Sequence, residues 1–411
     1  MTSSVADGEQ APPSSLWRNR DFGLLWGGQA LSSLGSSMAS LAYPLVVLEL
    51  TGSAVTAGAV GTVALVVQLL VNLPSGVLVD RVNRRRLMIG CDLLRLAAFG
   101  VLAAALLTGH GSVALVLAVA VVEALCDMPF FNAAMAAVRN LVPPHQVSTA
   151  MARNEARQYA VTLVGPPLGG AAFGLGRALP FAANAVSYLF SLVALLLIRT
   201  PLQEVKTEQP ASAVGDLVEG LRFMVTDPFL RATMLIAPPI NFALNGILFG
   251  LVLVLRGHGL SPALIGTAET LFGVGGLAGA LAAGWLLRRF AFPLLLRGIC
   301  VAGVPLMLAV LPLSGSPLAA APVAVLGFLG PALNAGLFGH LARVVPDRLQ
   351  GRAIGAIMLA AMGLTASAPV VAGLLVHHFG AAGIAVGAAA AMAVAATGAL
   401  TSKGIREISA G

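Results

Sequence analysis

The stretch GVLVDRVNRRR, residues 76–86, joins two long apolar runs through a short connection that holds one aspartate and four arginines. Three of the arginines are consecutive, and Asp80 directly precedes the first of the four. Lys and Arg gather in the cytoplasmic loops of membrane proteins, whereas acidic residues contribute little to this orientation rule. Topology therefore accounts for most of the arginines, but Asp80 needs a further explanation.

The composition of the whole chain excludes a soluble globular protein. Of the 411 residues, 58% are hydrophobic and only 10% are charged, and the mean hydropathy is +0.91. Soluble domains carry about 25% charged residues. The formal charge of +7 does not indicate nucleic-acid binding, because the arginines lie at the ends of apolar runs and not on one polar face. The three cysteines have no metal-ligand spacing and indicate neither a disulfide framework nor a metal site.

Apolar runs long enough to span a bilayer occur about twelve times, since a spanning helix needs about 20 mostly apolar residues. The polar residues 199–228 divide these runs into six and six, so we expect two halves at 16–198 and 229–411 joined by a linker. Residues 1–15 lack the basic start and apolar core of a signal peptide and are predicted to be a disordered tail. The runs are 22–49, 54–79, 87–108, 112–138, 155–176, 180–198, 229–255, 262–287, 292–313, 317–342, 353–378 and 381–401.

The positions of Lys and Arg in the short loops predict the orientation. With the N-terminus in the cytoplasm, only Arg177 and Arg256 fall in outer loops, and the opposite orientation would invert this bias. We therefore expect a multi-pass protein of the inner, or plasma, membrane. Both termini and the 199–228 connection are predicted to be cytoplasmic.

The two predicted halves are related by an internal repeat. A shift of 208 residues aligns 53–81 with 261–289, and a shift of 203 aligns 165–170 with 368–373. Two parallel repeats of six spans are an architecture of membrane transporters. The second shift matches Pro166 with Pro369 and Gly170 with Gly373.

With these features, the chain resembles the major facilitator superfamily. Residues 76–86 resemble its loop between helices 2 and 3, G-x-L-x-D-R-x-G-R-R, with Asn83 in place of the second Gly. VGPPLGG in the fifth span resembles the G-P-x-x-G-G core of the antiporter motif of drug exporters, although Val161 replaces its upstream Gly. CDLLR and VEALCDMPFFNAA resemble the exporter branch that includes macrolide efflux proteins and the enterobactin exporter. The matching residues are Gly76, Asp80, Arg81, Arg84 and Arg85 in the first motif, and Gly165, Pro166, Gly169 and Gly170 in the second.

The resemblance implies an all-α integral membrane protein with the major facilitator fold, with about twelve transmembrane helices in two six-helix halves. It also implies that Asp80 meets the cytoplasmic end of helix 11, which starts near Arg352, and latches the outward-facing state. A carboxylate is favoured at a helix N-terminus and beside arginine. The second copy of the loop motif carries Arg288 in place of Asp80, so only the first half supplies this aspartate.

Three acidic residues lie deep in the predicted spans. Glu123 and Asp127 are four residues apart in the fourth span and share one helical face. At ~1.5 Å per residue, Glu123 lies ~16 Å from the start of the span, near the middle of the membrane. Intramembrane carboxylates normally face a water-filled cavity or a partner, and two together repel when charged, so this pair is a candidate proton site. The alternative is a local polar contact, for example with Asn132 or with a neighbouring helix. Glu269, which the repeat aligns with Gly61, is a further candidate for substrate or proton contact.

One further pair of charges is predicted in the third span. Asp92 and Arg95 are three residues apart and can pair on one helical face. We expect a structural ion pair here and not a transport site.

These observations favour a secondary active transporter that exports small amphipathic molecules, drugs or natural products, by proton antiport with alternating access. The Gly-rich residues 273–284 lie within a span, without a preceding strand or a following Lys-Ser/Thr, so we expect neither a nucleotide site nor any cofactor. The alternatives are a proton-coupled importer or facilitator of a small metabolite, a non-transporting membrane sensor, and a membrane enzyme, although the six histidines lack metal spacing. The expected partners are a small-molecule substrate, protons and the lipid bilayer, with no nucleic acid, and we expect a monomer.

Overall fold

The computed structural model describes residues 16, 19–203, 226–345, 357–402 and 405. Throughout these residues the regular structure is helical, as the sequence predicts. The predicted tail 1–15 and most of the predicted linker lie outside the described residues. The long helices are α1 (Arg20–Thr51), α2 (Ala54–Arg81), α3 (Arg84–Leu107), α4 (Val113–Leu141), α5 (Val147–Leu175), α6 (Leu179–Leu197), α8 (Pro228–Gly257), α9 (Pro262–Arg289), α10 (Phe292–Leu308), α11 (Ala321–Val344) and α13 (Ala368–Thr401).

Nine segments of the described chain are long and apolar enough to cross a membrane. Two further helices accompany them: α10 has only 17 residues, and α5 is diluted by polar residues, glycine and proline. One of the nine, Ile357–Thr401, contains most of the predicted run 353–378 and all of the run 381–401, which Gly380 separates with a positive φ of 59°. Together these segments account for the predicted set of about twelve spans, which is therefore confirmed.

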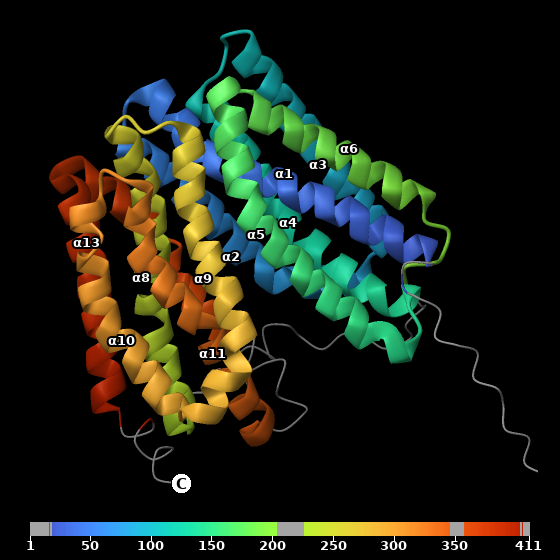
Figure 1. Cartoon of the computed structure of the whole chain (residues 1–411). Helices are drawn as coiled ribbons and strands as arrows, with labels where there is room; N and C mark the ends of the chain where they lie inside the picture. The colour runs from blue at the N-terminus through green and yellow to red at the C-terminus, as the bar shows by residue number, and fades with distance from the viewer. Residues whose placement is uncertain (1–15, 17–18, 204–225, 346–356, 403–404, 406–411) are drawn as a thin grey trace, which may run out of the picture.

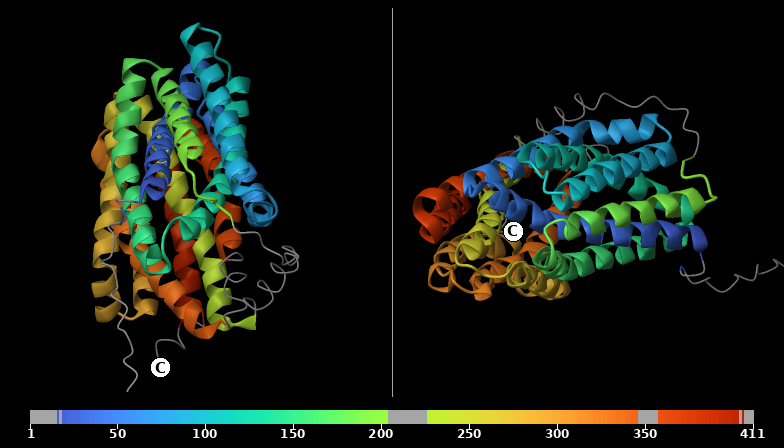
Figure 2. Two further views of the ribbon diagram at one scale, coloured as in Figure 1. Left: turned by 90° about the vertical axis from the view of Figure 1, so that its right-hand side faces the viewer. Right: turned by 90° about the horizontal axis from the view of Figure 1, so that it is seen from above.

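The helices gather in two groups. Figure 1 shows α1–α6 on one side and α8–α13 on the other, and the view from above in Figure 2 shows the two groups side by side. The groups touch mainly through α5 packed on α9 and α2 packed on α13. We call them the N-half and the C-half; the predicted boundaries at 16–198 and 229–411 stay a prediction.

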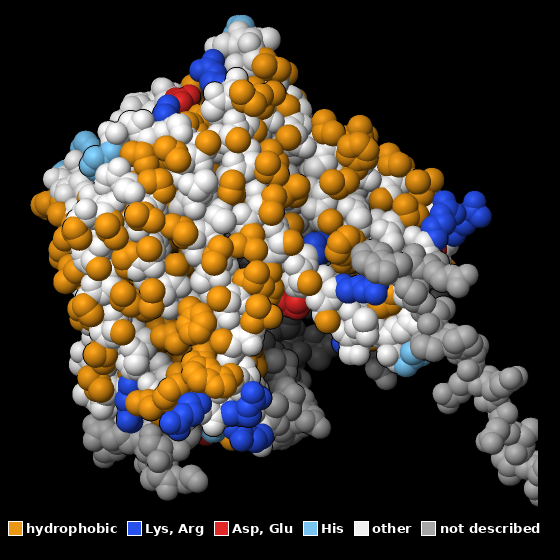
Figure 3. All heavy atoms as spheres, viewed as in Figure 1, with side chains coloured by type: hydrophobic (Ala, Val, Ile, Leu, Met, Phe, Trp, Pro, Cys, Tyr) orange, Lys and Arg blue, Asp and Glu red, His pale blue; other side chains and the backbone are white. Residues whose placement is uncertain are grey.

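The two ends of the helix bundle differ in their turns. All the glycines with positive φ in the described chain lie in turns at one end, which we call the glycine-turn end: Gly52, Gly109, Gly259 and Gly380. Because consecutive helices run in opposite directions, the turns after α2, α4 and α9 lie at the other end, where these helices carry Arg81, Arg139 and Arg289 in their last turns. We call this the arginine end. Figure 3 shows most Lys and Arg side chains toward its lower and right-hand edges, which belong to this end.

The halves meet through glycines that lie directly against prolines. Gly58 of α2 lies against Pro369 of α13, and Gly266 of α9 lies against Pro166 of α5; a side chain on either glycine would collide with the carbonyl group of its proline. The repeat relates the two contacts: the shift of 208 aligns Gly58 with Gly266, and the shift of 203 aligns Pro166 with Pro369. A second pair of contacts obeys the same relation: Gly373 with Ala54, and Gly170 with Pro262.

An ion pair also joins the halves near the glycine-turn end. Nη2 of Arg256 at the end of α8 lies 2.8 Å from Oε1 of Glu49 near the end of α1, and the two side chains are 30% and 31% exposed. Exposed pairs of this kind contribute about 0–1 kcal/mol. This ion pair therefore contributes little to the contact between the halves.

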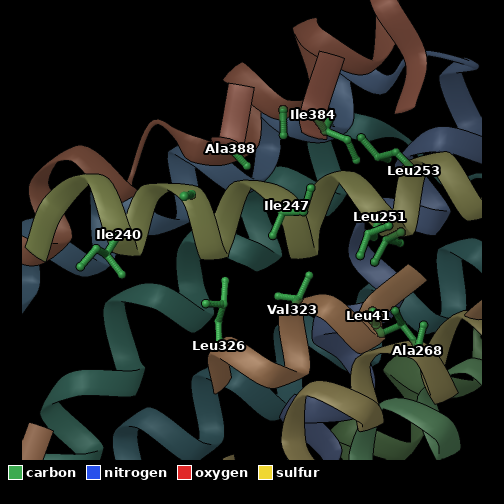
Figure 4. Packing of buried hydrophobic residues seen from close by; sticks show 14 of the residues in the cluster. Leu41, Ile240, Ile247, Leu251, Leu253, Ala268, Val323, Leu326, Ile384 and Ala388 are labelled. Atoms are coloured by element: carbon green, nitrogen blue, oxygen red, sulfur yellow. The ribbon is translucent and has the colours of Figure 1, made fainter. Parts of the chain in front are cut away.

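The largest apolar core runs through both halves. In the C-half, α8 lies between α11 and α13, and buried Ile247 of α8 lies between Val323 of α11 and Ile384 of α13 (Figure 4). Many large apolar side chains face outward instead, including Leu70 and Leu281. An outer surface of this kind suits lipid and not water.

Candidate functional site

A cavity with a volume of about 540 Å³ lies between the two halves. Residues of α1, α2 and α4 form one wall, and residues of α8, α9 and α13 form the other. Figure 3 shows the surface hollowed between the halves toward the arginine end. The polar residues that line the cavity are Ser36, Ser37, Ser40, Tyr43, Gln68, Glu123, Asp127, Asn245 and Glu269.

All three acidic residues predicted to lie deep in the membrane line this cavity. Glu123 and Asp127 come from α4 of the N-half, and Glu269 comes from α9 of the C-half. Within the described part of the chain, no Lys, Arg or His lines the cavity. The cavity is therefore an acidic chamber with carboxylates on both walls.

Glu123 is half-buried and held by two tyrosines. The hydroxyl of Tyr43 on α1 donates to Oε2 at 2.9 Å, and the hydroxyl of Tyr188 on α6 donates to Oε1 at 3.4 Å. Tyr188 also shares a 2.8 Å hydrogen bond with the hydroxyl of Ser36. The carboxylate of Glu123 is thus oriented from α1 and α6 while it still faces the cavity.

Asp127 lies one helical turn further along α4 and has a different partner. Nε2 of Gln68 on α2 donates to its Oδ2 at 3.1 Å. Asn132, a possible local partner of the acidic pair, donates instead to the hydroxyl of Ser75 at 2.8 Å. The contacts of both carboxylates therefore reach across to other helices.

Glu269 lies on the opposite wall and has fewer polar contacts than Glu123 or Asp127. In the described residues it has neither a hydrogen bond nor an ion pair, and it lies beside the apolar Leu248 that lines the same cavity. Its counterpart in the repeat, Gly61, lies against Pro369 and Phe249. The C-half thus places one carboxylate where the N-half has only a close helix contact.

The predicted ion pair in α3 is present and buried behind the cavity wall. Nη2 of Arg95 lies 2.7 Å from Oδ1 of Asp92, with side chains 4% and 0% exposed. The guanidinium carbon of Arg95 lies 4.6 Å from the ring centre of Phe130 and 4.4 Å from that of Tyr188. Arg95 therefore stacks on two aromatic rings as well as pairing with Asp92.

Tyr43, Tyr188 and Gln68 are not among the predicted site residues. The chain has only three tyrosines, and two of them meet the same carboxylate. Only the two tyrosines carry a signal in the sequence. Tyrosine is rare in these apolar helices, and a buried tyrosine hydroxyl normally has a hydrogen-bond partner.

The arginines of residues 76–86 have structural partners that the sequence does not reveal. The backbone N–H of Arg84 donates to Oε1 of Gln203 at 3.2 Å, and its Nη1 donates to the carbonyl of Leu202 at 3.4 Å. Nη2 of Arg85 donates to the carbonyl of Leu196 at 2.9 Å. These contacts attach the start of α3 to the chain that leaves α6.

Other residues of this motif are placed in helices or at their ends. Gly76 lies within α2, and Arg81 is exposed at its end. Asn83, which replaces the expected glycine, caps α3 by accepting from the N–H of Arg86 at 3.1 Å. The side chain of Asp80 and the predicted start of helix 11 lie outside the described residues, so the latch stays a prediction.

The residues of the antiporter motif lie where α5 crosses its neighbours. A side chain at Gly165 or Gly169 would collide with Ser37 or Met38 of α1, while Pro166 lies against α9. None of the four motif residues (Gly165, Pro166, Gly169 and Gly170) lines the cavity. Gly165 and Gly169 thus allow close packing within the N-half, and Pro166 and Gly170 lie in the contact with the C-half.

Comparison with known proteins identifies relatives over most of the chain. Residues 25–361 match the family model described as the Major Facilitator Superfamily. The chain is 28% identical over 343 residues to the multidrug efflux pump Tap of Mycolicibacterium fortuitum, covering 78% of this chain and 80% of that protein. It is 26% identical over 269 residues to macrolide efflux protein A of Streptococcus pyogenes, covering 64% of this chain and 66% of that protein.

The fold is also shared with solved structures. A bacterial homologue of the iron transporter ferroportin, in its inward-facing state, superposes with a TM-score of 0.72 at 17% identity, over 94% of this chain and 98% of that one. Since the family model covers most of the chain, the protein is a transporter in a membrane and not an enzyme. The chain belongs to the Major Facilitator Superfamily.

Proposed function

We propose that this transporter exports small amphipathic molecules, drugs or natural products, in exchange for protons. The observation that carries the proposal is the acidic chamber between the halves, with Glu123 and Asp127 on one wall and Glu269 on the other. Carboxylates in a water-accessible cavity within a membrane are suited to taking up and releasing protons. The two efflux proteins among the relatives support the direction of transport.

The lining of the cavity suits an amphipathic substrate. Phe249, Leu65 and Leu248 supply apolar surface beside the carboxylates and the amide of Asn245. A volume of about 540 Å³ lies within the range of about 300–1,000 Å³ that is usual for small-molecule sites. Positively charged substrates are favoured, because the described lining of the cavity contains acidic residues and no basic one.

In the proposed cycle the two halves rock about this cavity. The positive-inside rule assigns the arginine end to the cytoplasm, so the packed glycine-turn end faces outward and the cavity is reached from inside. Transport then requires the Gly58–Pro369 and Gly266–Pro166 contacts to separate. Uptake of a proton by the acidic pair from outside would displace a cationic substrate, and loss of that proton inside would allow the next substrate to bind.

Everted membrane vesicles test the proposal. Ethidium, a fluorescent amphipathic cation, and erythromycin, a macrolide, serve as probes. We expect the vesicles to concentrate at least one probe when the lumen is acidic, and we expect nigericin, which collapses the pH gradient, to abolish this uptake. Concentration by right-side-out vesicles under an inward proton gradient would instead support the importer, and the absence of flux for a broad panel would support the sensor.

A further inference from the structure

We propose that Arg95 is a positioning residue for proton coupling: together with Asp92 it sets the charge that the Glu123–Asp127 pair experiences, and it acts on Glu123 through Tyr188. This inference rests on the proposed proton antiport. It assigns a function to a buried ion pair that does not line the cavity and that neither substrate nor solvent reaches.

The burial of Asp92 and Arg95 needs an explanation. The two side chains are 0% and 4% exposed and share one charged hydrogen bond of 2.7 Å. Removing two charges from water is costly, and well-packed apolar residues of similar volume often stabilise a protein as well or better. Helix packing alone therefore gives no reason for a guanidinium at this position.

The contacts of Arg95 lead toward the acidic pair. Its guanidinium stacks on Phe130, which lies three residues after Asp127 on α4, and on Tyr188 of α6. The hydroxyl of Tyr188 contacts Oε1 of Glu123 at 3.4 Å. One continuous chain of contacts thus runs from Asp92 through Arg95 and Tyr188 to Glu123.

The stacking on Phe130 and Tyr188 brings the charge of Arg95 beside α4, the helix that carries both carboxylates. Around this cluster α1 supplies Tyr43, α2 supplies the neutral Gln68, α3 supplies Cys91, α4 supplies Cys126, and α6 supplies Tyr188. Among these described groups Arg95 is the only cation. Asp92 offsets this cation, so changing either member alters the charge beside the acidic pair.

The two single changes therefore have opposite effects. Asp92→Asn leaves the positive charge of Arg95 uncompensated, so the acidic pair should release its proton at lower pH. Arg95→Met removes the cation, and buried Asp92, left without a counter-charge, takes up a proton. The acidic pair then has no positive neighbour, so release should require higher pH. Each shift should be about one pH unit, a tenfold change in proton affinity. The double variant Asp92→Asn/Arg95→Met has the same charge as Arg95→Met with protonated Asp92 and should show the same shift.

Proton release on ethidium binding measures the proton affinity of the acidic pair directly. Ethidium is added to the purified full-length transporter in weakly buffered detergent, and pyranine reports the protons released at each pH. The pH of maximal release is compared among the variants, together with ethidium counterflow in proteoliposomes at equal pH on both sides. Arg95→Lys, which keeps the charge but loses the planar stack, should keep the pH of maximal release while counterflow becomes slower.

The exposed pair Glu49–Arg256 supplies the matched control, because Glu49→Gln and Arg256→Met change the same charges near the glycine-turn end. These two variants should leave the pH of maximal release where it is in the wild type. If Asp92→Asn does not fold, the contrast between Arg95→Met, which should shift the pH of maximal release, and Arg95→Lys, which should not, decides the question. Shifts of Asp92→Asn and Arg95→Met in the same direction, or a wild-type profile in every variant, would overturn the role of Arg95 but not proton antiport. A wild type that releases no protons at any pH, although it transports ethidium, would overturn proton antiport and this role together.

Discussion

The two halves repeat one pattern of helix contacts but differ in the hydrogen bonds of their polar groups. In the N-half, Glu123 and Asp127 are held by partners from three other helices. In the C-half, Glu269 faces the cavity without a hydrogen bond to any described residue. One wall thus carries oriented carboxylates in a network, and the other carries a single carboxylate that is free to meet a ligand.

The contacts between the halves show the same difference in finer detail. Oγ1 of Thr62 accepts a hydrogen bond of 3.0 Å from the N–H of Val370. The repeat places Thr270 opposite Pro167, which has no N–H, and Thr270 instead donates to the carbonyl of Leu163 at 3.1 Å. Duplication preserved the close approach of the helices, whereas the polar groups diverged after it.

The largest expected effect comes from removing the acidic pair of the N-half. Glu123→Gln/Asp127→Asn should abolish concentrative uptake of ethidium by everted vesicles, by roughly a hundredfold or more, because no carboxylate remains in the oriented network. Downhill exchange of ethidium should partly survive. Vesicles of the double variant that still concentrate ethidium with normal pH dependence would show that the pair is structural and that coupling belongs to Glu269.

The next effect tests whether the repeated helix contacts are equivalent. Gly58→Val and Gly266→Val each insert a side chain where the partner helix leaves no room. Overpacking of this kind costs about 1–3 kcal/mol, which shifts the balance between two states about 5–150-fold. We expect both variants to open the glycine-turn end to a similar degree.

Thiol labelling from either side of the membrane measures this opening. Asn245→Cys places a reporter in the cavity of a variant from which the three native cysteines have been removed. Gly276→Ala on α9 is the control, because its new methyl group meets no atom within 4 Å. Opening by Gly58→Val but not by Gly266→Val would mean that the two crossings are unequal, contrary to their packing.

The lone carboxylate of the C-half should affect binding more than coupling. Glu269→Gln should weaken ethidium binding about tenfold, equivalent to about 1.4 kcal/mol, since one charged contact with a cation is lost. The dependence of uptake on the pH gradient should remain. Titration of ethidium fluorescence gives the affinity, and a loss of pH dependence with unchanged affinity would place Glu269 in the proton pathway.

The smallest expected effect comes from the two threonines. Thr62→Val leaves the N–H of Val370 without its acceptor, and Thr270→Val leaves the carbonyl of Leu163 without its donor, since Pro167, four residues further on, has no N–H. A net hydrogen bond contributes about 0.5–1.5 kcal/mol, so we expect each variant to open the glycine-turn end several-fold. The same thiol assay applies, and an effect of only one of the two variants would show that the two hydrogen bonds are not equivalent.

Local patterns in the sequence were sufficient for the helices and for part of the site. Length and hydropathy predict the spans, and a spacing of four residues places Glu123 and Asp127 on one face of α4. The tyrosines that hold Glu123 lie 80 and 65 residues away along the chain. No local pattern encodes contacts of that kind, because they depend on how the helices pack.

The loop at residues 76–86 shows a second limit. Its match to a family motif predicts a gate, but the partners of Arg84 and Arg85 lie more than a hundred residues further along the chain. From the sequence, Asn83 is a tolerated substitute for glycine in a left-handed turn. In the structure its φ is −66°, which is not left-handed, and its side chain caps α3. One side chain can satisfy a motif and a local backbone need at once, and sequence alone does not separate the two.

The ion pair between Glu49 and Arg256 makes the closed end sensitive to the surrounding electrolyte. About a third of each side chain is exposed, so dissolved ions reach the pair, while the buried glycine–proline contacts are shielded from them. Raising the ionic strength from 0.01 M to 0.15 M shortens the Debye length from about 30 Å to about 8 Å. The attraction between the halves therefore weakens in saline surroundings, and the resting population shifts slightly toward the open end before any substrate or proton has bound.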